Sequence, residues 1–382
     1  MTSIILGTNV ERQTRRNTMN SGLEDVVAAE TVLSDVDGLA GRLVIRGRSL
    51  DDLVPHSSVE DGIELLWDGF FEQLPTGEEL QKALGEARLQ VFHHTDALDD
   101  ALMELSPLEA LRALMARIPD EGDLTAALHL MAAPAVFTTA ILRERKGRRP
   151  IRPDPTLPHS ADILRMMNAG MPDEVEVAGL DTYLMAVCDH GLNASTFAAR
   201  VVASTRAGLT SSLLAAISAL KGPLHGGAPG PVLDMLDAIG RPDNAEWWLE
   251  SAIADGERLM GFGHRVYRVR DPRADALKGA LKRIESLGHE RGKHRVELAE
   301  AVEKAAIAIL RRHKPDRALE TNVEFYTALL LEQLGFPREA FTCVFAMGRT
   351  MGWIAHCREQ IATNKLIRPQ SRYVGPKVEL VA

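Results

Sequence analysis

The chain is poor in several residue types, and each shortage excludes a class of protein. Only three of its 382 residues are cysteines, an odd number with no metal-like spacing, which predicts reduced thiols and excludes a disulfide framework. Acidic residues outnumber basic ones and give a formal net charge of −9 at pH 7, so a nucleic-acid-binding face is not expected. No apolar run reaches membrane-spanning length, which predicts no membrane association. We therefore expect a cytoplasmic globular protein with unpaired cysteines, which are Cys188, Cys343 and Cys357.

The first twenty residues, MTSIILGTNVERQTRRNTMN, contain arginine and threonine and almost no acids. This composition has a faint likeness to a transit peptide. We favour a disordered leader over residues 1–21, with Met19 as an alternative start.

Strand signals are confined to the start of the chain. Residues 26–33 and 43–45 flank Asp37-Gly38, a good turn dipeptide, and predict a short β-hairpin. Beyond it the patterns are helical, with no alternation of strands and helices, which predicts a mainly α-helical fold. At 382 residues the chain exceeds the size at which single cores stop growing, so two domains, or one with a large insertion, are expected.

Local signals predict where helices begin and how deeply they are buried. The spacing Ser58-x-x-Asp61, and the corresponding spacing from Thr76, resemble capping boxes at helix starts. Residues 209–220 and 326–335 are apolar on most faces, which predicts helices buried all round.

Two further segments show helical periodicity on one face. Residues 298–310 place apolar side chains at helical spacing and leave Glu300, Glu303 and Lys304 for solvent. Residues 194–202 do the same, and their predicted buried face consists of Ala194, Phe197, Ala198, Val201 and Val202.

The stretch Lys221-Gly-Pro-Leu-His-Gly-Gly-Ala-Pro is the most informative for chemistry. Its glycines let the backbone bend freely and approach a ligand closely. Pro229 and Pro231 suit the first turn of a following helix, whose N-terminus pushes the pKa of His225 down so that the neutral ring can donate a hydrogen bond. A histidine in a tight structural turn is the alternative, and the local residues do not decide between the two.

Residues 261–273 bring together two glycines, Gly261 and Gly263, with His264. Gly-x-Gly alone is weak evidence, and no third glycine follows to complete a dinucleotide-binding fingerprint. Arginines at this density supply planar donors that suit carboxylates and phosphates, although a solvated charge run is the alternative. These arginines are Arg265, Arg268, Arg270 and Arg273.

A carboxylate, Glu324, stands at the entry of the apolar segment that follows Asn322. Burying a charge requires a partner or a purpose, so this residue is a candidate functional carboxylate. A favourable charge at a helix N-terminus is the alternative. Two isolated arginines follow, Arg349 within a helical segment over residues 346–360 and Arg368 in Leu-Ile-Arg-Pro.

Together these stretches resemble the citrate synthase family, and the match extends over about residues 22–375. The opening segments Gly22-Leu-Glu-Asp-Val-Val and Arg46-Gly-Arg-Ser-Leu are similar to the family's hairpin and first helix. Six further motifs occur in the family's order. They are His190-Gly-Leu-Asn-Ala-Ser-Thr, Gly222-Pro-Leu-His-Gly-Gly-Ala, Gly261-Phe-Gly-His-Arg-Val-Tyr with Asp271-Pro-Arg-Ala, Asn322-Val-Glu-Phe-Tyr, Arg349-Thr-Met-Gly-Trp and Leu366-Ile-Arg-Pro.

The resemblance implies a role for each matching residue. His225 would donate to the carbonyl of an acyl-CoA thioester, Glu324 would remove a proton from its methyl group, and His264 would polarise the ketone of oxaloacetate. The carboxylates of that oxo-acid would be held by His190, Arg273, Arg349 and, from a second subunit, Arg368. Contacts to CoA are expected from Arg268, Gly261, Gly263 and Asn322.

The resemblance also implies a homodimer with a shared site and no cofactor beyond the CoA thioester substrate. The fold it implies is helical, with a large domain (residues 22–218 and 331–382) over which a small domain (residues 219–330) closes. The reaction it implies is citrate synthesis from acetyl-CoA, oxaloacetate and water, an acyl transfer of the tricarboxylic acid cycle.

Two residues depart from the family pattern. The family usually has Asp where this chain has Glu324, and Asn where it has Pro229. Propionyl-CoA as the acyl donor, as in 2-methylcitrate synthase, is one alternative, since a single methylene is worth only about 1–3 kcal/mol of discrimination. A catalytically weak relative that acts as a ligand sensor or scaffold is the other.

Overall fold

The computed structural model describes residues 23, 26–54, 56–226, 229–263, 267, 269, 271–286, 290–315 and 319–376. The helices and strands of the described chain all lie within the unit formed by residues 31–382. The leader predicted over residues 1–21 lies outside the described residues.

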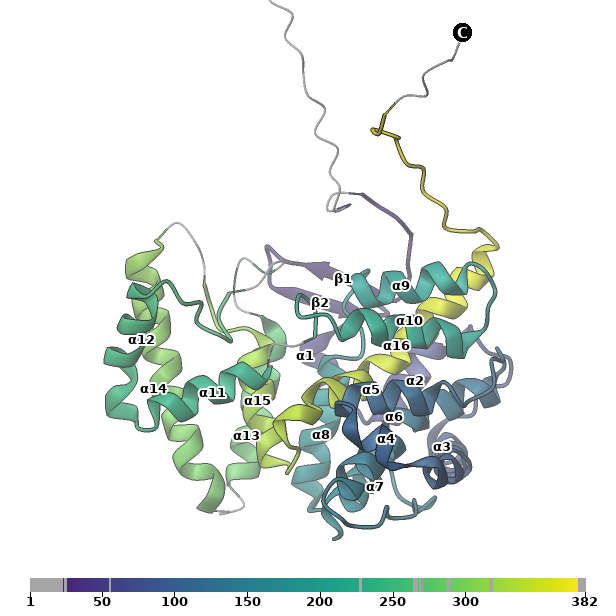
Figure 1. Cartoon of the computed structure of the whole chain (residues 1–382), viewed down its shortest axis with the longest axis horizontal. Helices are drawn as coiled ribbons and strands as arrows, with labels where there is room; N and C mark the ends of the chain where they lie inside the picture. Colours follow the sequence, from purple (N-terminus) through teal and green to yellow (C-terminus); the bar gives the residue numbers. More distant parts are fainter. Residues whose placement is uncertain are drawn as a thin grey trace, which may run out of the picture. The chain divides into compact units, whose positions relative to one another are not determined.

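Sixteen α-helices make up most of the described chain, together with one small three-stranded sheet (Figure 1). This confirms the predicted mainly α-helical fold. The strands are β1 (Ser34–Asp37), β2 (Arg42–Ile45) and β3 (Arg48–Ser49). The α-helices are α1 (Leu50–Leu53), α2 (Val59–Trp67), α3 (Gly77–Phe92), α4 (Asp100–Glu104), α5 (Pro107–Met115), α6 (Leu124–Glu144), α7 (His159–Asn168), α8 (Glu174–Ala186), α9 (Ala194–Ala203), α10 (Leu209–Leu220), α11 (Pro229–Ile239), α12 (Ala245–Ala254), α13 (Pro272–Glu285), α14 (Glu290–His313), α15 (Val323–Gln333) and α16 (Phe341–Thr363). Short 3₁₀ helices span His93–Ala97, Pro242–Asn244 and Arg338–Ala340.

The predicted hairpin is present, but its first strand is displaced. β1 pairs antiparallel with β2, from Ser34 opposite Ile45 to Asp37 opposite Arg42. The strand predicted over residues 26–33 is therefore wrong, since β1 begins one residue after that range. The partner strand ends at Ile45 because Arg46 adopts a left-handed backbone with φ 49°, which turns the chain into β3.

The two predicted helix starts differ in their chemistry. At Ser58 the capping box is confirmed, because its N–H donates to the Asp61 carboxylate at 2.8 Å and the Asp61 N–H donates to its hydroxyl at 3.2 Å. Thr76 does precede α3, but its side chain makes no capping bond. The Gly77 N–H instead donates to the Glu64 carboxylate, which α2 supplies.

The centre of the core is formed by α6 and α16, which pack against each other. Both contact α5 and α10, and α16 also contacts α9. The structure contradicts the prediction that no apolar run reaches membrane-spanning length. Of the described helices, the 21-residue α6 alone is long and apolar enough to span a membrane, with a mean hydropathy of 1.6. Its apolar window is 83% buried inside the protein, as in a core helix, so its composition carries no argument for a membrane span.

Periodicity predicted the wrong buried face for α9. The predicted apolar positions are half-buried or exposed, and the face that packs inward carries Ser195, Thr196 and Arg200. The Arg200 guanidinium is buried because it donates to Glu359 at 2.5 Å and to Gln360 at 3.0 Å on α16. Polar side chains can occupy a core face when the fold supplies such partners.

Residues 209–220 form a helix, but burial on all sides is wrong there, because Ser218 of α10 is exposed and four further residues are half-buried. In the second segment α15 is almost fully buried up to Leu331 and ends at Gln333.

Glu303 on α14 corrects another prediction. Glu303 is buried, not solvent-facing, and its carboxylate accepts hydrogen bonds from Lys278 at 2.7 Å, Thr321 at 2.7 Å and Tyr326 at 2.6 Å. Burial raises the pKa of Glu303, but these three donors outweigh it and hold the pKa below its ordinary value.

Five helices, α11 to α15, pack largely on one another, through α12 against α14 and through α15 against α11 and α13. They join the remaining helices mainly where α13 packs against α8 (Figure 1). The division into a large domain and a small domain over residues 219–330 stays a prediction.

Candidate active site

Glycines let the middle of α16 approach the end of α8 closely. A Cβ at Gly348 would lie 2.7 Å from the Val187 side chain, and one at Gly352 would overlap the Cys188 carbonyl oxygen. Glycine is therefore required at both positions. The side chain that follows Gly348 is Arg349, so its guanidinium enters the core at this contact.

Arg349 is buried and has no ion-pair partner within the described part of the chain. Its Nε donates to the Val187 carbonyl at 2.5 Å, and its guanidinium lies 4.7 Å from the centre of the Phe345 ring. Burial lowers the pKa of Arg349 to about 10, partly opposed by the negative charge of Asp189. A buried cation without a bound carboxylate is costly, and this one fits a site that receives an anion from outside.

His190 and Arg273, two predicted carboxylate ligands, meet at the ring of Tyr267. His190 Nε2 lies 3.1 Å from the Tyr267 hydroxyl, with the two rings edge to face at 5.6 Å. The Arg273 guanidinium lies 5.8 Å from the centre of the same ring. The structure therefore brings these residues together, although they are far apart in sequence.

Asp271 joins the helices that carry Arg273 and Glu324. It caps α13, and its carboxylate accepts from Arg273 Nε at 3.0 Å and from Arg273 Nη2 at 2.7 Å. The same carboxylate accepts from the Val323 N–H, at the start of α15, at 3.2 Å. Asp271 thus fixes the position of Arg273 relative to Glu324, the residue after Val323.

Glu324 lies in the first turn of α15, where its N–H donates to the capping side chain of Asn322 at 3.0 Å. Removal from water raises the pKa of Glu324 to about 7, against the opposing positive charge of Arg273. Over the described residues, the Glu324 carboxylate makes no hydrogen bond or ion pair. A half-buried carboxyl group with a pKa near neutral pH has the properties of a general base.

The predicted CoA segment is tied to the same helix start. Phe262 and Thr321 form an isolated antiparallel bridge, and Asn322 Nδ2 donates to the Gly263 carbonyl at 2.8 Å. Gly261 and Gly263 have φ values of +85° and +77°, which only glycine adopts without strain. The Asn322 side chain is thus engaged within the protein at both its oxygen and its nitrogen.

His225 lies in the turn after α10 and contacts the buried face of α9. Its Nε2 lies 2.8 Å from the Ser195 hydroxyl, which also receives a hydrogen bond from Trp353 Nε1 at 3.2 Å. Burial first, and then the charge of Arg349, lowers the pKa of His225 to about 4, so the ring is neutral at physiological pH. Trp353 follows Arg349 by one turn of α16, so His225 and Arg349 share this side of the helix.

Arg368 is not brought to this cluster. It is exposed on the segment after α16, where the neighbouring Ile367 N–H donates to Ser204 at 3.1 Å at the end of α9. His264 and Arg268 lie outside the described residues.

Sequence reasoning did not single out Ser195, Tyr267 or Asp271, each of which contacts a predicted site residue. Asp271 had a usable signal, because an Asp followed by Pro is typical of an N-cap and the first helical position. The contacts of Ser195 and Tyr267 join distant segments and had no local signal.

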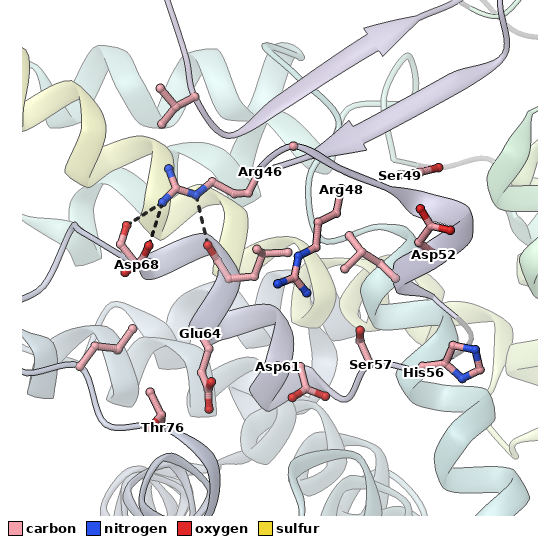
Figure 2. A pocket seen from close by; sticks show the side chains of 15 residues that line it. Arg46, Arg48, Ser49, Asp52, His56, Ser57, Asp61, Glu64, Asp68 and Thr76 are labelled. Atoms are coloured by element: carbon pink, nitrogen blue, oxygen red, sulfur yellow. Dashed lines mark hydrogen bonds and ion pairs between the residues drawn. The ribbon is translucent and has the colours of Figure 1, made fainter.

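A groove of about 1050 Å³ lies beside α2, and none of the described site residues lines it (Figure 2). Its charged lining is mostly acidic, with Asp52, Asp61, Glu64 and Asp68. Of its arginines, Arg46 is held by the Leu65 carbonyl at 3.2 Å and by Asp68. The acidic excess does not suit an anionic ligand.

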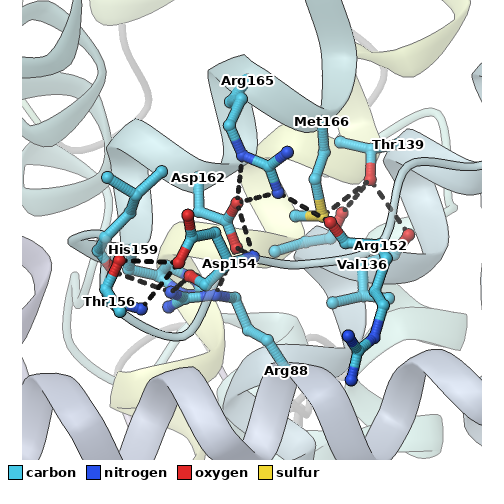
Figure 3. Close-up of polar contacts among 12 residues, drawn as sticks. Arg88, Val136, Thr139, Arg152, Asp154, Thr156, His159, Asp162, Arg165 and Met166 are labelled. Atoms are coloured by element: carbon cyan, nitrogen blue, oxygen red, sulfur yellow. Dashed lines mark hydrogen bonds and ion pairs between the residues drawn. The ribbon is translucent and has the colours of Figure 1, made fainter. Parts of the chain in front are cut away.

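A second cluster of buried charges, around Arg88, has its donors paired within the protein (Figure 3). Arg88 donates to Asp162 at 2.8 Å and contacts His159 Nδ1 at 3.3 Å. Its remaining donors are directed to the carbonyls of Asp154 at 3.1 Å and Leu157 at 2.7 Å. These bonds connect the loop before α7 to α3, so the cluster has a structural role.

Comparison with known proteins identifies the family of the chain. The model of the citrate synthase C-terminal domain matches residues 22–370. The chain is 39% identical to a citrate synthase of Haloferax volcanii, covering 94% of this chain and 96% of the relative. It is 36% identical to citrate synthase 2 of Bacillus subtilis, covering 94% of this chain and 96% of the relative.

A solved structure with the same fold is the ternary complex of carboxymethyl coenzyme A and oxaloacetate with citrate synthase from Thermoplasma acidophilum. It superimposes with a TM-score of 0.81 at 28% identity, over 94% of this chain and 97% of that one. Sequence, fold and motif order thus agree that the chain belongs to the citrate synthase family and is an acyltransferase of the citrate synthase type.

Proposed function

We propose that the protein condenses acetyl-CoA with oxaloacetate and water to give citrate and CoA. The observation that carries this proposal is Arg349, a buried guanidinium for which the described chain offers no carboxylate. An oxo-dicarboxylate would supply the missing negative charge. The relative from Thermoplasma acidophilum, crystallised with oxaloacetate and a CoA derivative, supports this substrate class.

In the first proposed step, Glu324 removes a proton from the methyl group of acetyl-CoA while His225 donates to the thioester oxygen. The pKa of Glu324, about 7, lets the carboxylate exist at neutral pH and still be basic enough to accept this proton. The pKa of His225, about 4, supports its role as a neutral donor.

The Ser195 hydroxyl lies between His225 Nε2 and Asn193 Oδ1, each 2.8 Å away. When this hydroxyl donates to Nε2, the ring proton is on Nδ1 and is available to a thioester oxygen. When it donates to Asn193, the ring proton is on Nε2. Ser195 therefore couples the tautomer of His225 to the hydrogen bonds of α9.

In the second step, the enol carbon attacks the oxaloacetate ketone and a carbon–carbon bond forms. His190, Arg273 and Arg349 would hold the oxo-acid carboxylates, and His264 would polarise the ketone. Water then cleaves the thioester of the citryl-CoA formed and CoA leaves as the thiol. These steps move protons between side chains and substrates and use no prosthetic group or metal.

Two parts of this proposal, the CoA contacts and the shared site, rest on the resemblance. Arg268 and the backbone of residues 261–263 and 322 would contact CoA. Arg368 would reach the site of a partner subunit, which makes the homodimer part of the active site. Its exposed position, away from the other site residues of its own chain, is compatible with that role.

A cytoplasmic location is proposed from the unpaired, buried cysteines.

A thiol-release assay with acetyl-CoA or propionyl-CoA, each with oxaloacetate, tests the proposal. We expect oxaloacetate-dependent CoA release with acetyl-CoA to exceed that with propionyl-CoA. Faster turnover of propionyl-CoA would indicate a 2-methylcitrate synthase. Oxaloacetate binding without CoA release from either thioester would indicate a weak relative that senses its ligand.

A further inference from the structure

Tyr183 on α8 is a fully buried tyrosine whose hydroxyl has no hydrogen-bond partner in the described structure. Buried hydroxyl groups are nearly always paired, because an unpaired one loses its bonds to water without replacement. No step of the proposed reaction uses this residue. A ligand that is present only during the reaction could supply the missing partner.

The position of Tyr183 is set by the helices around α8. This helix packs against α13, α15 and α16, which carry Arg273, Glu324 and Arg349 respectively. One turn before Tyr183, a Cβ at Gly179 would lie 2.7 Å from Ile284 of α13 and 3.7 Å from Leu330 of α15. Since residues four apart share a helix face, Tyr183 faces the same helices.

On its other side, α8 touches α16 directly before Arg349. A Cβ at Gly348 would lie 2.9 Å from the carbonyl oxygen of Leu184, the residue after Tyr183. The hydroxyl therefore lies where the three helices with charged site residues converge on α8, and not in a purely apolar part of the core.

The charges acting on the hydroxyl agree with this position. Burial raises the pKa of Tyr183 well above its ordinary value, the charge of Glu324 adds to the rise, and Arg349 and Arg273 oppose it. The phenol therefore stays protonated and acts as a donor. Oxygen atoms of an anion held by the two arginines are suitable acceptors for it.

We propose that Tyr183 contacts the substrate, and that its hydroxyl donates a hydrogen bond to a carboxylate oxygen of the oxo-acid bound at Arg349. This inference rests on the proposed function of Arg349 in binding an oxo-dicarboxylate. Tyr183 thereby adds a neutral, directional donor to the predicted ligands His190 and Arg273. The bond forms only in the complex, because the hydroxyl has no partner in the described structure of the free protein.

The test replaces Tyr183 by Phe, with Tyr326→Phe as the matched control. Tyr326 is also buried, but its hydroxyl donates to Glu303 at 2.6 Å in the free protein. For both variants, calorimetry gives the Kd of oxaloacetate, thiol release gives the KM of acetyl-CoA, and thermal unfolding gives the Tm with and without oxaloacetate.

For Tyr183→Phe we expect oxaloacetate to bind roughly 10-fold or more weakly, the scale of a lost hydrogen bond to a charged group. The KM of acetyl-CoA should stay within about twofold, since the lost contact is to the other substrate. The Tm without ligand should be unchanged or higher, because an unpaired buried group is removed, and the rise in Tm caused by oxaloacetate should shrink. Tyr326→Phe should show the opposite pattern, with a lower Tm and unchanged oxaloacetate affinity.

The possible failures are distinguishable. If Tyr183→Phe binds oxaloacetate as tightly as the wild type, the hydroxyl does not contact the substrate and the inference is overturned, while the proposed function stands. If wild-type protein binds no oxaloacetate, the proposed function fails first and the inference fails with it.

Discussion

Arg88 and Arg349 are both buried arginines in the helical core, yet their surroundings differ in kind. The donors of Arg88 are directed to Asp162, to His159 and to two carbonyl oxygens (Figure 3). Arg349 donates to one carbonyl. The carboxylate with the strongest influence on it, Asp189, is beyond ion-pair distance and lies 3.1 Å from His356. A buried charge whose partners lie within the protein has a structural role, whereas a buried charge without such partners can bind a ligand of opposite charge.

The same contrast separates two glutamates on neighbouring helices. Glu303 on α14 accepts three hydrogen bonds, which keep its pKa low. Glu324 on α15 has none to its carboxylate over the described residues, and burial raises its pKa to about 7. The satisfied glutamate is fixed as an anion, and the unsatisfied one is able to exchange a proton.

The largest expected effect comes from removing the paired arginine. Arg88→Leu should lower the free energy of unfolding by about 3–5 kcal/mol, because it breaks a buried ion pair and leaves carbonyl groups without donors. Urea unfolding followed by circular dichroism measures this loss. Arg349→Leu is the control of equal burial. It should change stability by less than about 1 kcal/mol, or raise it, while abolishing measurable oxaloacetate binding.

Equal loss of stability in the two variants would contradict the distinction between paired and unpaired buried charge. Retention of oxaloacetate binding by Arg349→Leu would remove the observation on which the proposed function depends.

The next effect concerns the two glutamates. Glu324→Gln keeps shape and hydrogen bonding but cannot accept a proton, so kcat should fall by about 100-fold or more, the scale of general-base loss. Its stability at pH 8 should rise. The folded pKa of about 7 exceeds the ordinary value of 4.5, so ionised Glu324 costs folding free energy as pH rises between these values, and Gln removes that cost.

Glu303→Gln is the matched control and should reverse both results. It weakens three charge-assisted hydrogen bonds and should destabilise the protein by about 1–3 kcal/mol, with kcat within a few-fold of wild type. Near-normal turnover in Glu324→Gln would show that Glu324 is a helix-terminal charge, and the first proposed step would then be wrong.

The contrast between paired and unpaired charges also explains what the sequence could predict. Helix positions followed from hydrophobic spacing and capping residues, as at Ser58, because these signals are local. The buried face of α9 did not, since hydrophobicity ranks Phe197 above Arg200. Arg200 is buried because Glu359 and Gln360, about 160 residues later, supply its partners. Such partners are visible only in the fold.

At the site, the ordered motifs identified which residues to examine, but not how they are held. Arg273 and Glu324 were named from separate segments, and the structure shows one carboxylate, Asp271, linking the helices that carry them. Whether a buried charge is paired depends on these distant contacts. Sequence reasoning therefore placed Glu303 in solvent, although its carboxylate accepts a hydrogen bond from Tyr326 on α15, the helix that carries Glu324.

A smaller effect should appear in the dependence of activity on pH. Because the base must be ionised and its pKa is about 7, kcat/KM for acetyl-CoA should rise about tenfold from pH 6 to pH 8. His225, with a pKa of about 4, contributes no limb in this range, since it is neutral throughout. Initial rates measured in buffers of constant ionic strength give the profile.

The residual activity of Glu324→Gln is the control for this profile and should be nearly independent of pH over the same range. A rising limb that persists in that variant would assign the titration to another group.

The smallest expected effect concerns Arg368, which is exposed and far along the chain from the other site arginines. If it completes the site of a partner subunit, Arg349→Leu and Arg368→Leu homodimers should each be inactive, and mixing them should restore activity. Random exchange makes about half of the dimers hybrids, and each hybrid has one site in which both arginines are intact, so about a quarter of wild-type activity should return. Arg349→Leu suits this experiment better than Arg273→Leu, because loss of Arg273 would break its buried ion pair with Asp271. Native mass spectrometry of chains with different tags measures the hybrid fraction, against which the recovered activity is scaled. Hybrids that form in full yet remain inactive would show that Arg368 acts within its own chain or not at all, and the shared-site dimer would then be abandoned.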